Sequence, residues 1–242
     1  MTRPPRSLGS RYPQFFDAPD GTSMPLERER RWSRTYRHPT KRIGHHISRF
    51  MDGSASISFV ELRTEWPRLS LRDRTDFCQN AAWLRGQHDF ADMLRFVIRE
   101  AGPEEWSAIA LSVASALPRD EAFQILSDCL NATDPAHASN LLQAVARTGH
   151  EAAPSIIRAH LDKLTSRPTL WDNDKFMNWM TFTAVCAIKY LLELGAEPSE
   201  FEQLVRALSA HPCEACRDSC RRFLGARYPW LPSAKPHDDG PG

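Results

Sequence analysis

The chain has 242 residues, of which 41% are hydrophobic and 25% are charged, and these values are typical of a globular protein. Its formal net charge of +1 argues against nucleic-acid binding driven by the charge of the whole molecule. Six cysteines are too few for the disulfide framework of a secreted domain at this length, and residues 1–25 lack the apolar run of a signal peptide, so the sequence predicts a cytoplasmic protein.

The first segment, residues 1–52, is basic and irregular. Residues 1–50 contain 11 Lys or Arg and 4 Asp or Glu, whereas the rest of the chain contains 20 and 26. This asymmetry is typical of an interaction arm and equally of a basic leader that folds back on an acidic body. We predict a partly disordered extension with one short helix, and its arginines make nucleic acid a second candidate partner.

Residues 53–231 show helical patterns almost throughout. Pro103 follows Gly102 and precedes two glutamates, which is typical of a first helical turn. Gly149 and Gly195 follow apolar-periodic runs, as residues that end helices do. We predict helices at about 58–65, 71–85, 88–101, 103–117, 119–131, 135–148, 152–165, 172–195, 199–210 and 213–227. The tail, residues 232–242, is predicted to be disordered.

The predicted helix 172–195 is apolar on nearly every side. Its longest apolar stretch, residues 176–194, is interrupted by polar residues such as Asn178 and Lys189, whereas a membrane span needs about 20 mostly apolar residues. We therefore predict a central buried helix that is covered on two sides, with the N-terminal region as one candidate cover, and no membrane partner.

A helix-pair period is visible along the chain. Pro103 and Pro135 are 32 residues apart, and each opens a predicted helix that is followed by a second one, as in repeat proteins. Residues 132–149, 151–161 and 211–225 resemble the repeat unit of HEAT-like proteins. The resemblance implies an all-α, right-handed α-solenoid of HEAT-like helix pairs with an irregular N-terminal extension. The excess of arginine over lysine suggests a bacterial source.

The second helices of the predicted pairs, 88–101, 119–131 and 152–165, would line a concave surface. Because the charges on this surface are mixed, they suit a protein partner better than a phosphate backbone. The leading hypothesis is a non-enzymatic scaffold or adaptor that binds a protein. The candidate binding residues on these helices are Arg95, Arg99, Asp128, Arg158 and Asp162.

The segment 169–179 combines tryptophans with carboxylates, and its candidate binding residues are Trp171, Asp172, Asp174 and Trp179. Such a group could hold a stacked base or a cation. The segment resembles the Trp-Asp motif of HEAT-like alkylpurine DNA glycosylases, which implies a DNA-binding enzyme as the alternative function. That family's catalytic carboxylate corresponds here to Lys175. A structural interpretation is favoured, in which residue 172, 173 or 174 caps the long helix and Trp171 is a hydrophobic staple.

Cys213, Cys216 and Cys220, with His211 nearby, have the spacing of metal ligands. A closed zinc site needs four ligands, and the sequence offers no second Cys-x-x-Cys pair to complete one. The favoured interpretation is that the cysteines pack in the core as small apolar residues, with a metal or redox role as the alternative. We therefore predict no catalytic residue, no metal and no cofactor.

Overall fold

The structure is a computed structural model, and it describes residues 58–172 and 178–231. All regular elements in these residues are helices, as predicted, and no strand occurs among them. The chain divides into two compact units, Met1–Ala116 and Leu117–Gly242. The predicted extension 1–52, residue Asp174 and the tail 232–242 lie outside the described residues.

The described residues of the first unit, 58–116, form four α-helices and two short 3₁₀ turns. α4 and α5 both pack on α6, and α3 packs on α5. Trp66 is fully buried between Phe77 and Phe96, with edge-to-face ring separations of 5.7 and 6.3 Å. Its elements are α3 (Phe59–Glu65), η3 (Trp66–Arg68), α4 (Leu71–Asn80), η4 (Ala81–Leu84), α5 (Phe90–Glu100) and α6 (Pro103–Ala116).

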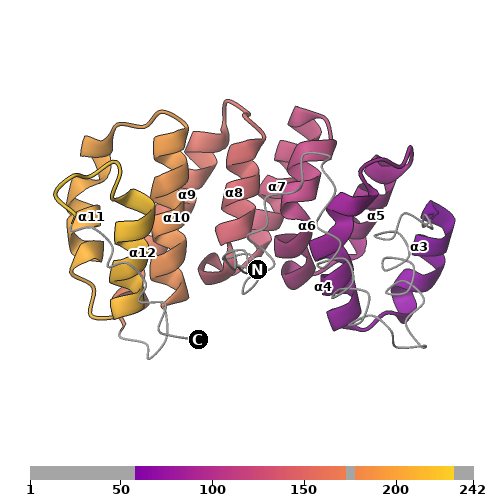
Figure 1. Cartoon of the computed structure of the whole chain (residues 1–242), viewed down its shortest axis with the longest axis horizontal. Helices are drawn as coiled ribbons and strands as arrows, with labels where there is room; N and C mark the ends of the chain where they lie inside the picture. The colour runs from indigo at the N-terminus through magenta and orange to yellow at the C-terminus, as the bar shows by residue number, and fades with distance from the viewer. Residues whose placement is uncertain (1–57, 173–177, 232–242) are drawn as a thin grey trace, which may run out of the picture. The chain divides into compact units, whose positions relative to one another are not determined.

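The described residues of the second unit form six α-helices and three 3₁₀ turns, and Figure 1 colours its helices from magenta at α7 to yellow at α12. Its first elements are α7 (Arg119–Ala132), η5 (Pro135–His137), α8 (Ser139–Arg147), α9 (Ala153–Thr165) and η6 (Pro168–Trp171). The later ones are α10 (Trp179–Glu193), η7 (Pro198–Phe201), α11 (Glu202–Ser209) and α12 (Glu214–Leu224).

α10 is the central helix of the second unit. Twelve of its 15 residues are buried, because α8, α9, α12 and η5 all pack against it. The predicted burial of this helix is confirmed. Gly195 ends the α10 region with a φ of 93°, and Gly149 ends the α8 region with a φ of 64°. Both lie in the left-handed region that glycine adopts most easily, so both predicted stops are confirmed.

Two predicted helix starts are wrong. Helix α10 begins at Trp179 rather than at residue 172, because the side chain of Asn178 accepts hydrogen bonds from the main-chain N–H groups of Met180 and Thr181. Asp172 has extended backbone after η6 and is not the helix cap. Pro135 opens only the three-residue turn η5, and α8 starts four residues later, at Ser139.

The helices in the described ranges also bear on the membrane prediction. None of them combines the length and the apolarity that crossing a bilayer requires. Helix α10, the most apolar by sequence, has 15 residues, whereas a spanning helix needs about 20.

Candidate functional site

Asn178 is the centre of a polar cluster in the second unit. Its Nδ2 donates hydrogen bonds to the main-chain oxygens of Thr169, Leu170 and Asp172, at 2.8, 3.3 and 3.1 Å. Its Oδ1 caps α10, as described above. The residue is 3% exposed, so its amide group is shielded from bulk water, where leaving a polar group unpaired is costly. Asn178 therefore fixes the end of η6 against the start of α10.

Trp171 and Trp179 flank this Asn178 cluster. Trp171 is 38% exposed and Trp179 is 49% exposed. The ring of Trp171 lies 6.0 Å from the ring of His211 in a stacked arrangement. The ring of Trp179 meets Phe182 edge to face at 5.8 Å. Each indole thus has one side supported by a buried ring, while a large part of it remains in contact with solvent.

His211 is buried beside Trp171 and joins η6 to the start of α12. Its Nε2 lies 2.9 Å from the main-chain oxygen of Leu170, which can only accept, so Nε2 carries the proton. Its Nδ1 accepts a hydrogen bond from the main-chain N–H of Cys213 at 3.0 Å. Thr181 Oγ1 donates to the same Leu170 oxygen at 2.6 Å. The imidazole is therefore held in one tautomer and one orientation.

Cys213 and Cys216 lie next to His211. One ligand atom from each of the three residues falls within 4.8 Å of the other two, and all three side chains are buried. Cys216 Sγ points to the main-chain oxygen of Asn178 at 3.8 Å. Cys220 belongs elsewhere, because its Sγ points to the main-chain oxygen of Val205 at 3.9 Å. The burial predicted for these cysteines is confirmed, and none of the six cysteines is in a disulfide.

The two neighbouring thiols differ in acidity. Burial acts to raise the pKa of Cys213, but hydrogen bonds from the thiol of Cys216 and from nearby main-chain groups outweigh it, so this pKa is lowered. Burial raises the pKa of Cys216 to about 11. The thiolate is the form that binds a metal, and the lowered pKa of Cys213 favours that form.

The five predicted residues of the concave surface fall in two different units. In the first unit, Arg95 Nη1 forms an ion pair with Asp92 at 2.8 Å, and Arg99 Nε donates to the main-chain oxygen of Arg95 at 3.1 Å. These contacts are within α5, and each side chain stays partly or fully exposed.

In the second unit, Arg158 connects α9 to η7. It pairs with Glu200 at 2.6 Å, and its guanidinium lies 5.5 Å from the ring centroid of Phe201. Asp162, one turn further along α9, is exposed. Arg158 thus stabilises the packing of the unit, and only part of its side chain is open to a partner. The exposed Asp128 is held by a hydrogen bond from Gln124 at 3.0 Å.

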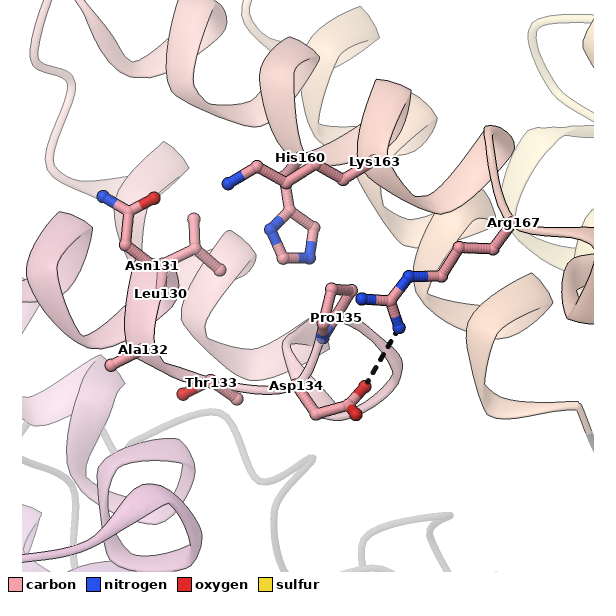
Figure 2. Close-up of a pocket in the computed structure, with 9 residues that line it drawn as sticks. All are labelled: Leu130, Asn131, Ala132, Thr133, Asp134, Pro135, His160, Lys163 and Arg167. Atoms are coloured by element: carbon pink, nitrogen blue, oxygen red, sulfur yellow. Dashed lines mark ion pairs between the residues drawn. The ribbon is translucent and has the colours of Figure 1, made fainter.

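A pocket of about 350 Å³ lies elsewhere in the second unit, between the ends of α7 and α9. Figure 2 shows the ring of His160 pointing toward Pro135, with Arg167 and Asp134 joined across the opening at 4.0 Å. His160 is 4% exposed, and its Nε2 has no hydrogen-bond partner. Burial lowers the pKa of His160. The ring is therefore a neutral wall of this pocket.

Sequence reasoning named Trp171, Asp172 and Trp179 but missed Asn178 and Thr181, which organise the site. The missed signal was local: an asparagine stands directly before the apolar run that becomes α10, and asparagine is a favoured N-cap. The contact between His211 and Leu170 spans 41 residues, and no sequence spacing predicts it.

The chain was compared with protein-family models, with curated proteins and with solved structures. No family model, no curated protein and no solved structure matches it.

Proposed function

We propose that the chain is an α-solenoid scaffold that binds a protein partner, and that Trp171 and Trp179 anchor the contact. The observation that carries the proposal is the exposure of these two tryptophans, 38% and 49%, on a rigid buried support. Tryptophan is enriched at the energetic centres of protein interfaces. A partner that covers both indoles would remove apolar surface from water, which stabilises a complex.

The rigidity of the support favours binding. Because Asn178 bonds to the main chain at Asp172 and caps α10, the backbone at Asp172 and at the start of α10 is already held by hydrogen bonds before a partner docks. Anchors that are already ordered avoid much of the entropic cost of association. The stacking of Trp171 on His211 restricts its indole in the same way.

The net charge of the second unit favours a protein partner over a nucleic-acid partner. Residues 117–242 contain 13 Lys or Arg and 16 Asp or Glu, and a net negative charge opposes contact with a phosphate backbone. The exposed charges nearest Trp171 in sequence are mixed, because Arg167 is basic and Asp172 is acidic. Mixed charges at an interface select a complementary protein surface.

The packing of successive helices supports the solenoid part of the proposal. Within the second unit, α7 packs on α8, α8 on α9, α9 on α10 and α10 on α12. Neighbour-to-neighbour packing of this kind is typical of repeat proteins, where each pair buries its apolar face on the next one. The HEAT-like resemblance of residues 132–161 fits the same arrangement.

Co-purification from the native host tests the function. The full chain, the double variant Trp171→Ala/Trp179→Ala and the control Trp230→Ala are expressed with the same tag, after nuclease treatment of the lysate. Trp230 is a matched control because it is 37% exposed but contacts Tyr228 and Arg206. We expect one protein to co-purify with the full chain and the control but not with the double variant. Equal recovery with all three would refute the proposal.

The second candidate function is a DNA-binding enzyme of the HEAT-like glycosylase type, in which the tryptophans would contact bases. It is favoured by the exposure of both indole rings, because bases stack on aromatic side chains. Duplex DNA binding measured at two salt concentrations separates the candidates. Affinity that falls steeply with rising salt, and falls again in Trp171→Ala/Trp179→Ala, would favour the enzyme.

A further inference from the structure

His211, Cys213 and Cys216 form a group of ligand-type atoms that the exposed tryptophans do not use. One nitrogen and two sulfur atoms lie within 4.8 Å of one another, and the three side chains are at most 4% exposed. Packing alone does not require two thiols and an imidazole to converge, because each could be replaced by an apolar side chain of similar size. The elements that bring them together are the turn before α12 and the first turn of α12.

We propose that His211, Cys213 and Cys216 bind a zinc ion, which fastens the start of α12 to η6 and α10. In a tetrahedral zinc site the Zn–S distance is about 2.3 Å and the Zn–N distance about 2.0 Å. Ligand atoms in such a site are therefore about 3.4–3.8 Å apart, as tetrahedral geometry requires. The observed upper limit of 4.8 Å exceeds this range by about 1 Å, which side-chain rotation covers.

The chemistry of the ligand set fits a divalent, moderately soft ion. Cys213 and Cys216 bind as thiolates, so two protons leave on binding, while neutral His211 supplies a lone pair. Two negative thiolates and one divalent cation give no net charge, which a buried site requires. The three protein ligands leave one tetrahedral position for a water molecule. Nitrogen and sulfur ligands select zinc over magnesium or calcium.

The surroundings of His211 resemble the outer sphere of a metal site. Metal-bound histidines commonly donate their second ring N–H to a main-chain carbonyl, which fixes the tautomer. Here Nε2 donates to the Leu170 oxygen, and Thr181 donates to the same oxygen. This leaves Nδ1 with its lone pair, which accepts from the Cys213 N–H. On metal binding, the zinc takes the place of that N–H at Nδ1.

A titration of the full chain with Co²⁺, followed by Zn²⁺, tests the site under reducing, metal-free conditions. We expect one Co²⁺ per chain, a thiolate-to-cobalt absorption band, and loss of that band when Zn²⁺ is added. X-ray absorption of the zinc-loaded chain should give two sulfur atoms at about 2.3 Å and a nitrogen at about 2.0 Å. Absence of cobalt binding, or a zinc environment without sulfur, would overturn the proposal. Because the cobalt titration and the X-ray absorption measurement both use the unsubstituted chain, neither depends on how any variant folds.

Variants assign the ligands. Cys213→Ser and Cys216→Ser should each weaken metal binding about 100-fold or more, and His211→Gln about 10- to 100-fold. The matched control is Cys220→Ser, which alters a buried cysteine of the same helix whose sulfur faces Val205, and it should bind as the full chain does. Equal binding by all four variants would overturn the assignment. So would a Cys213–Cys216 disulfide that forms in place of metal binding under these conditions, because it would show a redox pair.

Discussion

The side-chain amide of Asn178 lies 3.1 Å from the main-chain oxygen of Asp172, and it donates the hydrogen bond that joins η6 to the base of α10. Replacement of this side chain tests its structural role. Asn178→Ala removes the helix cap, worth about 1 kcal/mol, and the hydrogen bonds to the main-chain oxygens of Thr169 and Asp172, worth about 0.5–1.5 kcal/mol each. We expect the free energy of unfolding to fall by about 2–4 kcal/mol, measured by urea denaturation.

Asn131→Ala is the control for that experiment, because Asn131 is an exposed asparagine at the end of α7. Its effect should stay within about 0.5 kcal/mol. If the two variants unfold at the same urea concentration, Asn178 does not organise the site.

The left-handed backbone conformation of Gly195 gives a second prediction, for a glycine-to-alanine substitution. It has a φ of 93°, and a Cβ added there meets no atom within 4 Å. Any effect of Gly195→Ala therefore comes from the backbone, and we expect a loss of about 1–2 kcal/mol in stability. Gly86 also has open space but no positive φ, so Gly86→Ala should be neutral or stabilise by about 0.4–1 kcal/mol. Thermal unfolding of both variants measures the difference, and an equal loss in both would argue against the left-handed conformation.

The buried imidazole of His160 predicts a pH dependence of stability. Burial lowers its pKa in the folded chain, whereas in the unfolded chain the pKa is about 6.5. Above that pH the ring is neutral in both states and contributes no dependence. As the pH falls below about 6.5, only the unfolded chain binds the proton, so stability decreases until the folded-state pKa is passed.

Urea denaturation at a series of pH values from about 7.5 to about 5, a range that spans the ordinary histidine pKa, checks this prediction. As the pH falls, the free energy of unfolding should decrease less steeply in the His160→Leu variant than in the unsubstituted protein. The exposed His88 provides the control His88→Leu, which should keep the slope of the full chain. If the free energy of unfolding falls with pH equally steeply in all three proteins, His160 is not the group responsible.

The ion pair between Arg158 and Glu200 gives a prediction for the pKa of the Glu200 carboxyl group. A hydrogen bond from the main-chain N–H of Glu197 and another from Arg158 lower the pKa of Glu200. In Arg158→Ala this pKa should rise, but it should stay below its ordinary value because the Glu197 N–H remains. An NMR titration of the Glu200 carboxyl carbon measures it, with Arg206→Ala as a control that removes a different pair. An unchanged pKa in Arg158→Ala would mean that the arginine is free for a partner.

The elements that sequence reasoning predicted well are those whose ends are decided locally. Pro103 and Gly195 act through their own backbone geometry, and both mark helix ends in the structure. The start of α10 was predicted wrongly because the polar residues 172–174 offered several caps, and only the tertiary contacts of Asn178 select one. The site could not be predicted as a whole, since His211 reaches Leu170 across 41 residues. Arg158 was predicted as a partner contact, yet its pairing with Glu200 depends on how α9 packs on η7.

Photocrosslinking in the native host tests the central claim most directly, with a photoreactive amino acid placed at position 179 and, as a control, at the exposed position 60 of the first unit. The account predicts a crosslinked species from position 179 only, which is resistant to nuclease and is identified as a protein by mass spectrometry. A product that nuclease destroys, or the absence of any product from position 179, would contradict it.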